Sequence, residues 1–168
     1  KPKLFYGLDH KTTGVHSTIY SYDMDDHDTD RRLSPKSIHI QLSHYMLWSG
    51  LQMLGQDCYA IFEDDVRFVP GWKERMQEAI KSLPDDWDLL YLGSCNCLDS
   101  VSDDDRVGAD LFRVDRASCL HAYVVRAKVL PVLLERCERV WAPVDLAMHV
   151  DTVPGGSRPI VSYAVLPR

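Results

Sequence analysis

The sequence predicts an α/β domain with a mostly parallel sheet, and two observations support this fold class. Short, continuous apolar runs at residues 58–62 and 89–92 are typical of strands buried on both faces. Residues 34–55 and 72–83 instead show the apolar spacing of amphipathic helices. Strands that alternate with helices favour a parallel sheet, in which ligands bind beyond the carboxyl ends of the strands.

Local signals define the individual elements. Ser34 and Pro35 mark the start of the first helix, as its cap and its first helical residue, and Gly55 is placed to end it. Pro84 stops the second helix. The other expected elements are strands at residues 4–8, 111–114, 122–125 and 161–166, a helix at 130–137 and a short helix after Pro143.

Composition and charge restrict the class of protein. The 168 residues are 45% hydrophobic and 26% charged, which indicates one globular domain over residues 1–168. The formal net charge of −6 argues against a nucleic-acid partner. No apolar run approaches the roughly 20 residues that a transmembrane helix needs. Because the chain starts Lys-Pro-Lys, without Met or a signal peptide, we expect a trimmed chain or a fragment.

The five cysteines give no metal signature. Cys58 and Cys137 have apolar neighbours and are expected to be small core residues. Cys95 and Cys97 do not have the spacing of a zinc site. We therefore expect a reducing compartment, with one or two disulfides as the alternative.

An acidic triplet follows the first apolar strand directly. Glu63, Asp64 and Asp65 are adjacent like charges at the edge of a core, and a bound divalent cation would relieve their repulsion. Carboxylate oxygens suit a hard ion such as Mg²⁺ or Mn²⁺. In extended geometry Glu63 and Asp65 point to one side and Asp64 to the other. The alternative is a plain strand end whose acids meet water.

Motifs in a fixed order resemble those of a known family. Residues 43–48 (Ser-His-Tyr-Met-Leu-Trp) precede residues 60–66 (Ala-Ile-Phe-Glu-Asp-Asp-Val), and a strand ending in Leu-Gly follows at residues 88–93. Next come an aromatic-bearing strand at residues 122–127, which leads to a helix with paired leucines, and Pro-Val-Asp at residues 143–145. The ordered set resembles glycosyltransferase family 25, which includes bacterial lipopolysaccharide and lipooligosaccharide galactosyltransferases and procollagen galactosyltransferases.

The resemblance implies a GT-A fold and an inverting glycosyltransferase. The reaction would move a hexose, galactose in particular, from a nucleotide-sugar such as UDP-galactose to a saccharide, hydroxyl or glycoprotein acceptor, as in lipopolysaccharide biosynthesis. Glu63, Asp64 and Asp65 would then form the family's metal motif and bind Mn²⁺ (or Mg²⁺) against the diphosphate of the donor.

The resemblance also assigns the other site residues. Asp145 is the candidate catalytic base, although the helix dipole alone also favours a carboxylate at a helix start. The donor-binding residues implied are Glu63, Ser43, His44, Gly93 and Tyr123. For His44, which lies on the apolar face of its helix, a core role is the alternative.

Other functions stay open at this stage. The domain could be a catalytically silent relative that serves as a binding or adhesion module, or another nucleotide-handling GT-A enzyme. The compartment follows the acceptor: the bacterial cytoplasm, peripheral to the membrane, for lipopolysaccharide, or the endoplasmic reticulum lumen for collagen. No segment before Leu4 matches the family's first strand, so we expect a domain that lacks it.

Overall fold

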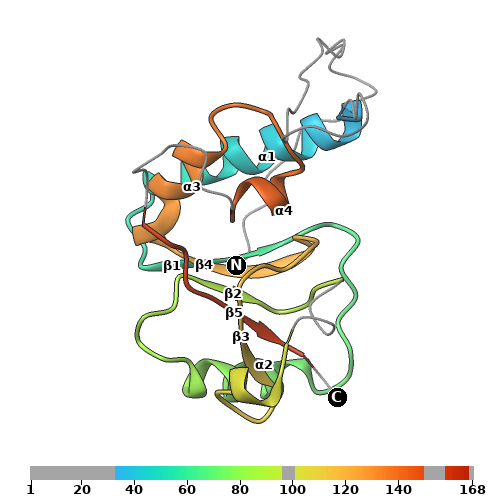
Figure 1. The fold of residues 1–168 in the computed structure, drawn as a ribbon, viewed down its shortest axis with the longest axis vertical. Helices are drawn as coiled ribbons and strands as arrows, with labels where there is room; N and C mark the ends of the chain where they lie inside the picture. Colours follow the sequence, from blue (N-terminus) through green and yellow to red (C-terminus); the bar gives the residue numbers. More distant parts are fainter. Residues whose placement is uncertain (1–32, 96–100, 150–157, 167–168) are drawn as a thin grey trace. The chain divides into compact units, whose positions relative to one another are not determined.

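The computed structural model describes residues 33–95, 101–149 and 158–166 (Figure 1). The strand expected at residues 4–8 lies outside these ranges. The chain divides into two compact units. The helical unit contains helices α1, α3 and α4, and the sheet unit contains five strands and helix α2.

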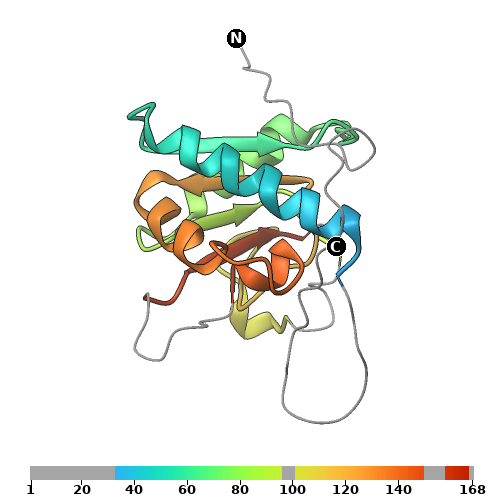
Figure 2. The same ribbon diagram turned by 90° about the horizontal axis from the view of Figure 1, so that it is seen from above.

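The helical unit is built on α1, which spans Pro35–Gln52. The Ser34 hydroxyl accepts a hydrogen bond from the Ser37 N–H at 3.1 Å and satisfies one free donor of the first turn, which confirms the predicted cap. Helices α3 (Leu130–Arg136) and α4 (Val144–Ala147) pack against α1 (Figure 2).

Two buried side chains fasten these helices together. Gln41, on α1, donates through Nε2 to the carbonyl oxygens of Cys137 and Arg139 at 3.3 and 3.0 Å. Arg136, at the end of α3, donates to the carbonyl oxygen of Met148 at 2.7 Å. The carbonyl groups of Cys137 and Met148 directly follow the last residues of α3 and α4, where carbonyl groups lack a partner within the helix, and Arg139 lies in the bend after α3.

The sheet unit is one mixed sheet with strand order β1-β4-β2-β5-β3. The strands are β1 (Cys58–Phe62), β2 (Leu89–Tyr91), β3 (Leu111–Val114), β4 (Ala122–Arg126) and β5 (Ser162–Val165). Helix α2, Trp72–Ser82, covers one face of the sheet (Figure 1). The core beneath α2 consists of Ala79, Leu90, Leu111, Val124, Tyr163 and Val165.

The prediction of a mostly parallel sheet is wrong for the described strands. Only β2 and β5 pair in parallel, whereas the β1–β4, β2–β4 and β3–β5 pairs are antiparallel. A continuous apolar run indicates that both faces of a strand are covered. It does not indicate whether the neighbouring strand runs parallel or antiparallel. The α/β class is confirmed, because helices and one sheet make up the described chain.

Strand β1 also differs from its prediction. Of its five residues only Ile61 is buried, and Cys58 is exposed although it was expected in the core. The reason is position, because β1 lies at one side of the described sheet and α2 covers the other strands better. Cys137 is buried as predicted, and burial raises the pKa of its thiol to about 12.

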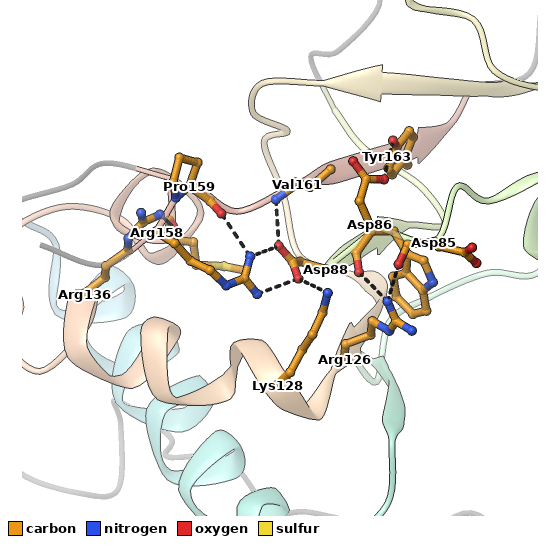
Figure 3. A network of polar contacts seen from close by, with 12 residues as sticks. Asp85, Asp86, Asp88, Arg126, Lys128, Arg136, Arg158, Pro159, Val161 and Tyr163 are labelled. Carbon is orange, nitrogen blue, oxygen red and sulfur yellow. Dashed lines mark hydrogen bonds and ion pairs between the residues drawn. The ribbon is translucent and has the colours of Figure 1, made fainter.

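A buried carboxylate joins the beginnings of β2 and β5 (Figure 3). The Asp88 side chain is fully buried and accepts two hydrogen bonds from Arg158, at 2.6 and 2.7 Å. It also accepts one from the Val161 N–H at 3.0 Å and forms an ion pair with Lys128 at 3.1 Å. Burial alone would raise the pKa of Asp88, but these hydrogen bonds outweigh it and hold the pKa below its ordinary value.

Candidate functional site

The acidic triplet forms a turn that is anchored through its backbone. The Glu63 N–H donates to the carbonyl oxygen of His121 at 2.9 Å, which extends the β1–β4 pairing by one residue. The Val66 N–H then donates to the Glu63 carbonyl oxygen at 3.3 Å and closes the turn. Glu63 is half-buried, whereas Asp64 and Asp65 are exposed. The turn therefore has a fixed base and presents two carboxylates to the solvent.

The chemistry of this turn fits a hard divalent cation that is shared with a phosphate ligand. The oxygens of Glu63, Asp64 and Asp65 do not all lie within 4.8 Å of one another, so the turn is not a closed cage. Mg²⁺ and similar ions are commonly held by one or two carboxylates together with substrate phosphates and water. The three residues can supply that part of a coordination shell.

A disulfide and a histidine shape the neighbouring loops. Cys95 and Cys119 are joined, which links the segment after β2 to the segment before β4 across 24 residues of sequence. In addition, the Cys95 N–H donates to the Ser118 carbonyl oxygen at 3.0 Å. A Cβ atom at Gly93 would lie only 2.6 Å from Nε2 of His121, so glycine is needed for the imidazole to pack against this segment.

A pocket of about 390 Å³ opens beside the acidic turn. Residues at the ends of β1, β2 and β5 and at the start of β4 form one part of its wall, and α2 with the loop before it forms the other. Its lining includes three aromatic residues and three polar ones, which are Phe62, Phe68, Trp72, Arg67, Ser94 and His121. Glu63, Asp64 and Asp65 do not line the pocket, although Phe62 and Val66 on either side of them do.

The other predicted residues of the sheet unit have different environments. Gly93 lines the pocket, because it lies in the segment that follows β2. Tyr123 lies in β4 opposite Ile61 and Tyr91 and is fully buried. Its ring is therefore a core group in this structure and offers no open face for stacking on a donor.

Three predicted residues lie in the helical unit. The Ser43 hydroxyl donates to the His39 carbonyl oxygen one turn earlier, at 2.8 Å. The buried ring of His44 lies 5.6 Å from the ring of Trp48, as expected for the apolar side of α1. Asp145 lies in the first turn of α4, where the helix dipole favours a carboxylate, and it accepts a hydrogen bond from the Leu146 N–H at 3.0 Å.

The structure thus brings together Glu63, Asp64, Asp65 and Gly93 around the end of the sheet. Ser43, His44 and Asp145 belong to the helical unit. Sequence reasoning missed His121, the Cys95–Cys119 pair and Asp88. The residues of each of these contacts are far apart in the chain, so the sequence carries no local signal for them. The Leu-Gly pair at residues 92–93 did indicate that the segment after β2 belongs to the site.

Comparison with known proteins gives the family. A family model described as glycosyltransferase family 25 (LPS biosynthesis protein) matches residues 3–148, which is most of the chain. The chain belongs to glycosyltransferase family 25. Within the described residues, no helix has the length and apolar character to cross a bilayer.

Curated relatives match over a shorter segment. Procollagen galactosyltransferase 1-A of Xenopus laevis is 42% identical over 55 residues, which is 31% of this chain and 9% of the relative. Inactive glycosyltransferase 25 family member 3 of Homo sapiens is 36% identical over 66 residues, or 38% of this chain and 11% of the relative. The matches therefore span about a tenth of each relative. No solved structure matches the chain significantly.

Proposed function

We propose that this family 25 domain transfers a hexose, galactose, from UDP-galactose to a hydroxyl group of a saccharide or glycoprotein acceptor, with inversion. The observation that carries the proposal is the acidic turn at the end of β1, anchored on His121, in a chain whose family membership covers residues 3–148. Relatives named procollagen galactosyltransferase support galactose as the sugar.

Each residue has a distinct part in the proposed reaction. Asp65 and Glu63, with Asp64, would hold Mn²⁺ or Mg²⁺, and this ion would neutralise the charge that develops on the diphosphate leaving group. Because the β1–β4 ladder fixes the base of the turn, the backbone that carries the carboxylates is in place before the donor arrives. Gly93, which follows β2 and lines the pocket beside the turn, is the proposed donor contact of this segment.

Asp145 is the proposed base. Its carboxylate would take the proton of the acceptor hydroxyl while the acceptor oxygen forms its bond to the anomeric carbon and the bond to the diphosphate oxygen breaks. Its hydrogen bond from the Leu146 N–H orients the carboxylate. Ser43, His44 and Tyr123 stay proposed donor-site residues, with an indirect part: the Ser43 hydroxyl is bonded within α1, and the rings of His44 and Tyr123 are buried, each in its own unit.

The test is Asp65→Asn, with Asp57→Asn as the control for loss of an exposed aspartate. We expect Asp65→Asn to lose Mn²⁺-dependent UDP binding in calorimetry and to reduce UDP-galactose turnover by at least about 100-fold. Asp57→Asn should behave like the wild type. Full Mn²⁺-dependent turnover in a folded Asp65→Asn variant would rule out the metal assignment.

A catalytically silent binding module is the second candidate, because several relatives, those of Homo sapiens and Mus musculus among them, carry names that call them inactive. Asp145→Asn separates the two candidates. For an enzyme it should preserve UDP binding and lower turnover by about 10²–10⁴-fold. A wild-type chain that binds UDP with Mn²⁺ and turns over no UDP-galactose would favour the silent module.

The disulfide supports an oxidising compartment, such as the endoplasmic reticulum lumen, over the reducing cytosol. Thiol counting on the denatured protein purified from its native source tests this. Thiols at Cys95 and Cys119 that can be alkylated only after reduction would support the lumen, and thiols there that react without reduction would support the cytoplasm.

A further inference from the structure

Three aromatic rings form an exposed cluster beside the acidic turn. Phe62 ends β1, Phe68 lies in the following loop and Trp72 begins α2. The ring of Phe68 lies 5.4 Å from that of Phe62 and 4.4 Å from that of Trp72, between ring centroids. Phe68 is 50% exposed and Phe62 is 38% exposed. Contiguous exposed aromatic surface of this kind usually marks a contact site, because it would otherwise be buried on folding.

The cluster is one wall of the pocket described above, and polar groups complete the lining. Arg67 is exposed and forms no ion pair with any described residue, whereas Arg75 nearby is neutralised by Asp110 at 2.9 Å. The Ser94 hydroxyl oxygen is buried and has no hydrogen-bond partner among the described residues. A buried hydroxyl without a partner is uncommon, and a ligand or a water molecule usually satisfies such a group.

These features define the chemistry of an occupant. A pyranose ring can lay its C–H face on Phe68, since sugars stack on aromatic rings through their apolar face. One negative group on that sugar would pair with the guanidinium of Arg67, which presents several donors to a carboxylate or phosphate. A sugar hydroxyl can supply the missing partner of Ser94. The pocket volume of about 390 Å³ lies in the range of small-molecule sites.

We propose that this pocket binds an acidic saccharide, a sugar that carries a single carboxylate or phosphate, as part of the acceptor. The acceptor role rests on the proposed function, because it needs the donor at the neighbouring acidic turn. Binding of the acidic saccharide to the pocket does not rest on the proposed function. A nucleotide diphosphate is a poorer fit, since of the two arginines that line the pocket only Arg67 lacks an anionic partner among the described residues.

The experiment titrates the intact chain with methyl β-D-glucuronide and, as its neutral counterpart, methyl β-D-glucoside, following tryptophan fluorescence or heat. Neither metal nor nucleotide is present, so the result is independent of whether the domain transfers galactose. We expect the glucuronide to bind in the millimolar range and the glucoside to bind at least about fivefold more weakly. Because the two glycosides share the same ring, their comparison tests the contribution of the carboxylate.

Variants locate the site. Phe68→Ala should weaken glucuronide binding by about tenfold, because it removes the most exposed ring. Arg67→Gln should weaken it by about fivefold and abolish the preference over the glucoside. The controls are Ile80→Ala and Lys81→Gln on α2, an exposed apolar residue and an exposed cation that do not line the pocket. Both should bind as the wild type does.

Three results would overturn the proposal. These are equal affinity for the two glycosides, glucuronide binding that Phe68→Ala leaves unchanged, and no binding of the glucuronide at about 20 mM. A fold check by circular dichroism accompanies each variant, and Phe68 and Arg67 are exposed enough for their replacement to leave the core intact. Glucuronide binding together with failed UDP binding would reject the proposed function and keep the pocket assignment.

Discussion

Replacing Asp88 by Asn tests how the sheet unit is held together at the beginnings of β2 and β5. The substitution keeps the volume of the side chain but replaces one carboxylate oxygen by an NH₂ group. The retained oxygen can still accept from the Val161 N–H and from one nitrogen of Arg158. The new NH₂ group then faces two donors, the other Arg158 nitrogen and Lys128, which the carboxylate oxygen contacts at 2.7 and 3.1 Å.

The magnitude follows from the contacts that are lost. Two charge-assisted hydrogen bonds disappear, each worth about 1.5 kcal/mol at the lower end of the range for charged partners. The lower end applies because the side chains of Arg158 and Lys128 are 43% and 46% exposed and can regain water. We therefore expect Asp88→Asn to lower the free energy of unfolding by about 3 kcal/mol at neutral pH.

The same contacts set the pH dependence. The pKa of Asp88 in the folded chain is below its ordinary value of 3.8, because the hydrogen bonds from Arg158, Val161 and Lys128 outweigh the opposing effect of burial. The stabilisation is therefore complete above pH 3.8 and is lost as the pH falls through the lower, folded value. The difference between wild type and Asp88→Asn should be constant from neutral pH to mildly acidic pH and then shrink.

Urea unfolding followed by tryptophan fluorescence measures both effects, and Arg158→Gln with the double variant gives the coupling energy. We expect the two single changes to be strongly non-additive, because they remove the same hydrogen bonds. A loss below about 1 kcal/mol at pH 7, or a difference that does not shrink in acid, would refute this account of the network.

Three other changes test separate features. Reducing the Cys95–Cys119 disulfide should lower the free energy of unfolding by about 3.5 kcal/mol, because the bond closes a loop and restricts the unfolded chain. Urea unfolding with and without a thiol reductant measures this loss, and no change would mean that the bond does not constrain the unfolded chain. Gly93→Ala should lower the free energy of unfolding by about 1 kcal/mol, because the new methyl group displaces the imidazole of His121. The ring resonances of His121 should then shift in NMR spectra, and unshifted resonances would contradict the packing. Ser34→Ala should cost about 1 kcal/mol through loss of the α1 cap, with Ser34→Asp as the rescue that keeps an acceptor.

Helices and strand positions were predictable because their signals are local. Ser34 and Pro35 define the start of α1 whatever packs around it, and the predicted strand at residues 111–114 coincides with β3. Strand direction was not predictable. The parallel pairing of β2 with β5 and the insertion of β4 between β1 and β2 depend on which strands meet in space, and apolar runs do not encode this.

The site was predictable only where its residues are adjacent in sequence. The triplet Glu63-Asp64-Asp65 is a local pattern, and the structure places it directly after β1 as expected. Its extended geometry was predicted wrongly, because the chain turns at Asp64 and Asp65. Whether these acids bind a metal stays a prediction. Asp88 looks like an ordinary polar start of a strand, and its partners Lys128 and Arg158 are 40 and 70 positions away, so only the folded chain reveals it.

His121 contacts one neighbour through its backbone and another through its side chain. Its carbonyl oxygen holds the Glu63 N–H, while its imidazole packs on Gly93 and lines the pocket. Every amino acid has the carbonyl, but few have the ring. Substitution at position 121 can therefore alter what the pocket accepts and leave the backbone support of the acidic turn unchanged. Within a lineage of such proteins, ligand preference could diverge at this position without disturbing the neighbouring turn.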